Sequence, residues 1–146
     1  MRPQKQAFLH NPPETYGDCF RTALACLLNM GRDEVPHFFE CDSDKCSWEP
    51  VNEWLLLRGL SLFSIPFNST LKELMDFMDR LNHDTYYMLC GRSPRGVSHQ
   101  VVALNTEIVC DPAIQGGGII GPCPEDDLYW VNVLLPSAIH KEQDNG

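Results

Sequence analysis

The chain has 146 residues, of which 43% are hydrophobic and 10% aromatic. This length and apolar content predict a single domain over residues 1–146 with a core of its own, and they exclude an intrinsically disordered chain. The 20 acidic residues outnumber the 11 basic ones and give a formal net charge of −9. Such a charge repels phosphate backbones and anionic lipid, so we expect neither nucleic acid nor a membrane surface as partner.

The N-terminus and the cysteines both indicate a cytoplasmic protein. Residues 1–6 are polar and lead into no long apolar run, so no signal peptide is predicted, and no apolar run approaches the length of a membrane span. The seven cysteines are odd in number and irregularly spaced. We therefore expect reduced thiols rather than a disulfide framework, with at least one thiol needing a separate explanation.

The first half of the chain carries most of the helix signals. Residues 1–16 are rich in Pro, Gln and Asn and predict an irregular lead-in. The first helix follows, because apolar residues recur three and four positions apart, Asp18 can serve as N-cap and Gly31 as the stop. The expected helices span about 19–30, 49–58 and 71–81.

Strand signals dominate the second half, where short apolar runs lie between turn residues. Helices first and sheet second predict an α+β protein, with N-terminal helices packed on an antiparallel sheet. Residues 113–124 contain three consecutive glycines and predict a long mobile loop, a flap beside the site, whereas the charged tail 141–146 is expected to fray. The expected strands span about 60–66, 85–90, 99–104, 107–110 and 128–135.

Three residues at element boundaries suggest nucleophilic chemistry. Cys19 begins the first helix, where unpaired N–H groups and the helix dipole stabilise a thiolate. His99 opens one apolar run and Asp111 follows another. Cys, His and Asp in this order predict a cysteine hydrolase with a nucleophile, a base and an orienting acid.

A predicted hairpin brings the base and the acid together. Asn105 and Thr106 form the turn between the strands that carry them, so His99 and Asp111 become neighbours. The carboxylate then binds the distal imidazole nitrogen and fixes its tautomer. The oxyanion would take the backbone N–H of Cys19 and one further donor.

Gly17-Asp18-Cys19 before a helix, Ser98-His99-Gln100 before an apolar run, and Asp111-Pro112 carry a family resemblance. The chain resembles the papain-like cysteine peptidase superfamily over about residues 16–121. It is most similar to small peptidases of the bacteriocin-processing type and to uncharacterised phage and bacterial papain-like proteins. The resemblance implies a papain-like fold, with the cysteine as nucleophile, the histidine as base and the aspartate as orienting acid.

One position departs from the family pattern. Papain-like peptidases usually place a glutamine about six residues before the cysteine to complete the oxyanion hole. Here Pro13 occupies that position, and the nearest amide is Asn11. Either the second oxyanion donor comes from elsewhere, or turnover is weak or lost.

A metal site is the main rival chemistry. His37, Cys41 and Cys46 lie within ten positions, with Asp42 and Asp44 among them. Zinc sites prefer cysteine pairs two to four residues apart and four ligands, so this pattern is a weak zinc signal. No metal or other cofactor is therefore expected.

Four further side chains have alternative roles. Cys110 and Cys123 flank the glycine loop and are able to approach each other, but solvated loop thiols are the favoured interpretation. Arg92 and Arg95 precede His99 closely and are expected to be solvated turn residues, with binding of an acidic substrate group as the alternative.

The sequence thus predicts a thiol-dependent hydrolase that cleaves a peptide, isopeptide or other amide bond in a protein or peptide substrate. One alternative is a catalytically silent papain-like module that binds a protein partner, for example a phage-encoded inhibitor. Another is an acyl transferase, which would pass the acyl group to an amine.

Overall fold

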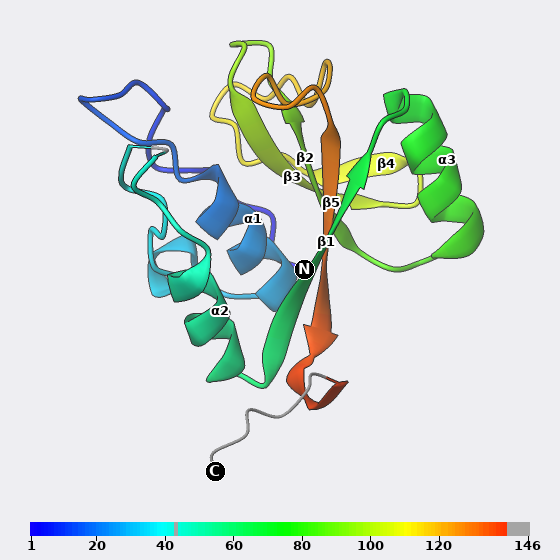
Figure 1. Cartoon of the computed structure of the whole chain (residues 1–146), viewed down its shortest axis with the longest axis horizontal. Coiled ribbons are helices and arrows are strands. Elements are labelled where there is room, and N and C mark those ends of the chain that lie inside the picture. Colours follow the sequence, from blue (N-terminus) through cyan, green and yellow to red (C-terminus); the bar gives the residue numbers. More distant parts are fainter. Residues whose placement is uncertain (43, 140–146) are drawn as a thin grey trace.

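A five-stranded antiparallel sheet forms the centre of the molecule, with helices on both of its faces (Figure 1). The computed structural model describes residues 1–42 and 44–139, so the tail expected to fray lies outside the described residues. The α+β class is confirmed. The helices are α1 (Cys19–Leu28), α2 (Glu49–Leu56) and α3 (Leu71–Leu81), and the strands are β1 (Leu60–Phe67), β2 (Tyr87–Arg92), β3 (Ser98–Leu104), β4 (Glu107–Cys110) and β5 (Tyr129–Pro136).

The helices form two layers, whereas the sequence predicted one. α1 and α2 pack on one face of the sheet around Leu24 and Val102, and α3 covers the other face around Leu74 and Val101 (Figure 1). The reason lies in the central strand β3, because its apolar residues Val101, Val102 and Ala103 point to alternate faces and are all buried. A strand that is apolar on both faces needs cover on both.

The strand order is β1-β5-β2-β3-β4, and every neighbouring pair is antiparallel. The expected hairpin between β3 and β4 is confirmed, because Leu104 pairs with Glu107 across Asn105 and Thr106. β2 and β3 form a second hairpin, in which Gly91 pairs with His99. These two hairpins fix the positions of the site residues on the sheet.

Several predicted boundaries are shifted by one to two residues. α1 ends at Leu28 because Asn29 adopts the left-handed conformation, φ 57°, and closes the helix before Gly31. α2 ends at Leu56 rather than at 58. β2 spans Tyr87–Arg92, so the turn expected to begin at Gly91 starts two residues later.

Asp18 occupies the N-cap position of α1, but its side chain does not cap the helix. The carboxylate is 1% exposed and accepts hydrogen bonds from the backbone N–H groups of Ala7 and Phe8, at 3.1 and 2.9 Å. It also forms an ion pair with Arg21 at 3.0 Å. The predicted N-cap position is therefore confirmed, but the Asp18 carboxylate binds backbone N–H groups of residues 1–16 instead of those of the helix.

The irregular lead-in is fixed between α1 and the end of β4. The N–H of Arg2 donates to the carbonyl of Cys26, and the N–H of Gln6 donates to the carbonyl of Pro112. Segments more than 80 residues apart in sequence are therefore joined through the first six residues.

The second half of the glycine-containing loop, from Gly118 to Gly121, is hydrogen-bonded to β2 and to Asp111. The N–H of Arg92 donates to the carbonyl of Gly121 at 2.7 Å, and the N–H of Ile120 returns a bond to Arg92 at 2.8 Å. Gly118 donates to the side chain of Asp111 at 2.8 Å. A loop with such anchors supports the site rather than opening over it.

The cysteines differ most from expectation. Cys41 and Cys46 form a disulfide, so the prediction of uniformly reduced thiols was wrong. Cys110 and Cys123 are buried, not solvated, because Cys110 ends β4 under α1 and Cys123 packs against β2. Among the residues that the structure describes, no helix has the length and apolar character that crossing a membrane requires.

Candidate active site

Cys19 is the first residue of α1 and is half-buried. As a first-turn residue it has a backbone N–H with no intrahelical acceptor, and it lies at the positive end of the helix dipole. The next residue, Phe20, is buried against Phe39 and Trp48 in edge-to-face contacts with centroids 5.3 Å apart in each pair. This aromatic packing and the bonds of Asp18 fix the start of the helix from both sides.

His99 and Asp111 meet as the sequence predicted. Nε2 of His99 lies 2.7 Å from Oδ1 of Asp111, and the imidazole is 5% exposed. The carboxylate is itself oriented by the N–H groups of Ala113, at 3.0 Å to Oδ1, and Gly118, at 2.8 Å to Oδ2. The acid is therefore held by three donors, and it in turn fixes the plane of the imidazole.

Cys19 lines the same cleft as His99, and its thiol is among the groups that raise the pKa of this imidazole. Because Asp111 occupies Nε2, the nitrogen that remains for the thiol is Nδ1. The structure thus brings together all three residues that the sequence singled out, in the order thiol, imidazole, carboxylate.

The pKa values of the pair favour a charged site. Burial lowers the pKa of His99, but the hydrogen bond to Asp111 and the interactions with Cys19 outweigh it and raise the pKa to about 9. Burial acts against ionisation of Asp111, yet the bonds from His99, Ala113 and Gly118 lower its pKa to about 2. At neutral pH the imidazole is therefore protonated and the carboxylate ionised.

The site opens into a cleft of about 1180 Å³ that contains Cys19 and His99. Phe39 and Trp48 line it on the side of α1, and Trp130 and Asn132 of β5 line it on the side of the sheet. Its size suits an extended chain segment or a side chain with its flanking backbone. Acidic residues also line the cleft: Asp42, Glu125 and Asp126.

Gln6 is the functional candidate that the sequence analysis missed. It lines the same cleft as Cys19 and is 8% exposed. Nε2 donates one hydrogen bond to the carbonyl of Phe8 at 2.6 Å, and an amide nitrogen has a second N–H to offer. Gln6 is therefore the candidate for the second oxyanion donor that is absent at Pro13.

The expected spacing of about six residues between a glutamine and Cys19 does not lead to Gln6, because residues 1–16 contain an additional turn. Asn11 and Thr15 bond to each other through both backbone groups, so the chain between Gln6 and Cys19 loops outward. Both positions examined in the sequence, Asn11 and Pro13, lie exposed on this turn. In the sequence, the only indication of this role was the presence of glutamine at another position within residues 1–16.

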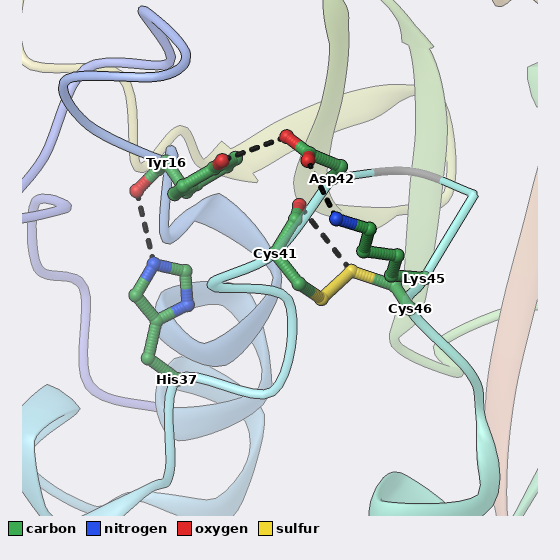
Figure 2. Close-up of a disulfide and its surroundings, with 6 residues drawn as sticks. All are labelled: Tyr16, His37, Cys41, Asp42, Lys45 and Cys46. Carbon is green, nitrogen blue, oxygen red and sulfur yellow. Dashed lines mark hydrogen bonds and ion pairs between the residues drawn. A yellow bond between two sulfur atoms is a disulfide. The ribbon is translucent and has the colours of Figure 1, made fainter.

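The alternative metal site around His37, Cys41 and Cys46 does not form. No group of three or more His, Cys, Asp and Glu side chains with the arrangement of a metal site occurs within residues 1–42 and 44–139. Cys41 and Cys46 are bonded to each other, and Nε2 of His37 lies 2.9 Å from the carbonyl of Tyr16 (Figure 2). The disulfide loop instead contacts the segment before the nucleophile, because Tyr16 donates its hydroxyl to Asp42 at 2.8 Å.

The two arginines have separate positions. Arg95 lines the cleft, and its guanidinium lies 3.4 Å from the carbonyl of His10. Arg92 packs its guanidinium against Gly121 instead. Of the two, Arg95 alone lies where a substrate group would pass.

Comparisons with models of protein families, with curated proteins and with solved structures gave no match to this chain.

Proposed function

We propose that the protein is a thiol-dependent hydrolase with a papain-like architecture, which cleaves a peptide, isopeptide or other amide bond. The observation that supports it best is the 2.7 Å contact between His99 and Asp111 in a cleft that also contains Cys19 at the start of α1. A buried imidazole with a carboxylate on one nitrogen and a helix-terminal thiol near the other has the arrangement of a nucleophile, base and orienting acid.

The proposed reaction has two stages. The Cys19 thiolate attacks the carbonyl carbon, and the oxyanion accepts hydrogen bonds from the Cys19 N–H and from Nε2 of Gln6. The imidazolium of His99 then donates its proton to the departing amine, leaving an acyl-enzyme. Neutral His99 next takes a proton from a water molecule as its oxygen attacks the acyl-enzyme, and breakdown of this adduct releases the acid and restores the Cys19 thiolate and the His99 imidazolium. Asp111 stabilises the imidazolium throughout.

A protein or peptide is the proposed substrate, since the open cleft admits an extended chain segment. No cofactor takes part in the steps above. A silent binding module would share the fold but would have no need of an activated thiol, and an acyl transferase would share the first stage only. These two alternatives make different predictions in the same experiment.

The test is alkylation of the native protein by iodoacetamide between pH 5 and 8, with each cysteine followed by peptide mass spectrometry. Cys19 should react first, and it should lose this advantage in His99→Ala. The protein is first reduced and desalted, and Cys90 then serves as the internal control, because it is also half-buried and lines the same cleft. If Cys19 reacts no faster than Cys90, the proposal fails and a binding module remains.

A substrate assay separates the hydrolase from the transferase. Fluorogenic peptide amides are incubated with the protein, with and without a primary amine such as glycinamide. A hydrolase releases the free acid in both cases, and Cys19→Ala releases none. Faster release with formation of the amide product would assign the chain to acyl transfer instead.

A further inference from the structure

The seven cysteines resolve into three close pairs and one remaining thiol. Cys41 and Cys46 are bonded as a disulfide. The sulfur atoms of Cys26 and Cys110 lie 2.7 Å apart, and those of Cys90 and Cys123 lie 3.3 Å apart. The pairs join positions 84 and 33 residues apart, respectively, so they arise from the fold and not from sequence proximity. Cys19 is the one cysteine outside the three pairs.

Packing holds each pair face to face. Cys26 is on the buried side of α1, and Cys110 ends β4 directly beneath it. Both thiols are buried away from solvent. Their sulfur atoms lie 2.7 Å apart, compared with about 2.05 Å in a disulfide bond. Cys90 of β2 meets Cys123 at the base of the cleft, where both line the cavity.

From this juxtaposition we propose that Cys26–Cys110 and Cys90–Cys123 are disulfide sites, so that the mature chain has three disulfides and Cys19 as its single free thiol. The odd number of cysteines is then explained, because six form structural disulfides and the seventh, Cys19, is the proposed nucleophile. This assignment stands on the pairing geometry and is independent of the proposed hydrolase activity.

The oxidation is a two-step thiol–disulfide exchange with glutathione disulfide as the oxidant. The hydrogen bond from Cys26 lowers the pKa of Cys110 to about 7, so Cys110 supplies the attacking thiolate. It forms a mixed disulfide and releases one glutathione thiolate, which takes the proton of Cys26. The Cys26 thiolate then attacks the protein sulfur of the mixed disulfide and releases the second glutathione. Two protein thiols are oxidised and one glutathione disulfide is reduced.

The two bonds would brace opposite sides of the site. Cys26–Cys110 links the helix that begins with Cys19 to the residue preceding Asp111. Cys90–Cys123 links β2 to the loop that contains Glu125, whose carboxylate accepts a hydrogen bond from Ser98 beside His99. Such a chain is suited to an oxidising environment, where three structural disulfides persist.

The experiment counts thiols in the full-length chain. The protein is equilibrated with glutathione disulfide, unfolded in guanidinium, alkylated, and mapped by mass spectrometry without reduction. The expected result is one cysteine outside the protein disulfides, Cys19, either alkylated or joined to glutathione, and cross-linked peptides for the three pairs, against seven alkylated cysteines after dithiothreitol. The oxidised protein should melt at least about 10 °C above the reduced one.

Single variants test the pairing itself. Cys26→Ala should leave Cys110 and Cys19 alkylated after oxidation, and Cys90→Ala should leave Cys123 and Cys19 alkylated. The proposal is overturned if the wild-type chain retains three or more free thiols in glutathione disulfide, or if Cys19 is found in a protein disulfide. The peptide map of the wild-type chain alone decides between these outcomes, so a variant that misfolds does not change the result of the test.

Discussion

Nε2 of His99 and Oδ1 of Asp111 lie 2.7 Å apart, although 12 residues separate them in the sequence. The hairpin of β3 and β4 makes this contact possible, and Ala113 and Gly118 hold the carboxylate in place through their N–H groups. The pKa shifts of His99 and Asp111 both arise from this one contact. Their contributions to the free energy of unfolding are therefore not added together.

The pH dependence of stability should follow from this pair. The folded pKa of His99, about 9, exceeds the ordinary value, so its stabilisation is complete below pH 6.5 and is lost as pH rises through 9. The folded pKa of Asp111, about 2, lies below the ordinary value, so its stabilisation is complete above pH 4 and is lost as pH falls through 2. The pair therefore stabilises the fold most between about pH 4 and 6.5.

Urea unfolding at pH 6 and pH 9.5 measures this effect in wild type and Asp111→Asn. Wild type should lose roughly 2–3 kcal/mol more than the variant over this range. His83→Gln is the control, since His83 also pairs with an aspartate, Asp79, but is exposed, so its pH dependence should match wild type. Equal losses in wild type and Asp111→Asn would contradict the prediction.

Catalysis should also respond to the pKa of His99. Protonated His99 is needed as the acid for the leaving amine, so hydrolysis should fall as pH rises through about 9. Asp111→Asn removes the largest favourable contribution to the charge on His99 and should move this upper limb to lower pH. The pH profile of kcat/KM for an amide substrate measures it, and an unchanged upper limb in the variant would assign the limb to another group.

Asp18→Ala should destabilise the fold by about 3 kcal/mol, because it leaves two backbone donors without an acceptor and removes the ion-pair partner of Arg21 at 3.0 Å. The matched control is Asp33→Ala, whose side chain is 78% exposed and pairs with Arg32. That variant should cost under about 1 kcal/mol. Chemical denaturation of both variants decides the matter, and equal costs would mean that the bonds of Asp18 add nothing.

Gln6→Ala should lower kcat about 100-fold with little change in KM, since an oxyanion donor acts in the transition state. Alkylation of Cys19 by iodoacetamide involves no oxyanion and should proceed at the wild-type rate. Asn11→Ala, which removes the exposed amide of the same lead-in, is the control and should leave kcat unchanged. A parallel loss of alkylation in Gln6→Ala would show a structural role instead.

Gly91→Ala should destabilise the protein by displacing the loop that contains Ile119 and Gly121. A Cβ at Gly91 would lie 2.5 Å from Cγ2 of Ile119 and 2.7 Å from the carbonyl oxygen of Gly121. The backbone oxygen cannot yield without moving the loop, so we expect a loss of about 1–3 kcal/mol in unfolding free energy. Gly31→Ala is the control, because its added Cβ would meet a flexible glutamate side chain at 3.1 Å. Thermal melting of both variants provides the comparison.

The sequence predicted the sheet hairpin and the three central site residues because these depend on local signals. Asn105 and Thr106 specify a turn, and the turn determines which strand residues face one another. A cysteine at the start of an amphipathic helix is visible from periodicity alone. The class of fold followed from the order of these elements.

The features that were missed depend on tertiary partners. The acceptor role of Asp18 requires the lead-in to fold back onto the helix, and no local pattern encodes that return. Gln6 was overlooked for the same reason, since an outward turn lengthens the chain between it and Cys19. The pairing of Cys26 with Cys110 joins two elements that only the packed sheet brings together.

The position of the lead-in also constrains the order in which the chain can fold. Residues 1–6 are synthesised first, yet the carbonyl that receives the N–H of Gln6 belongs to Pro112. The start of the chain therefore has to wait until more than a hundred further residues have left the ribosome, and closing so long a loop is slow. Until that closure, the hydrogen bond that holds Gln6 against the residue after Asp111 cannot form.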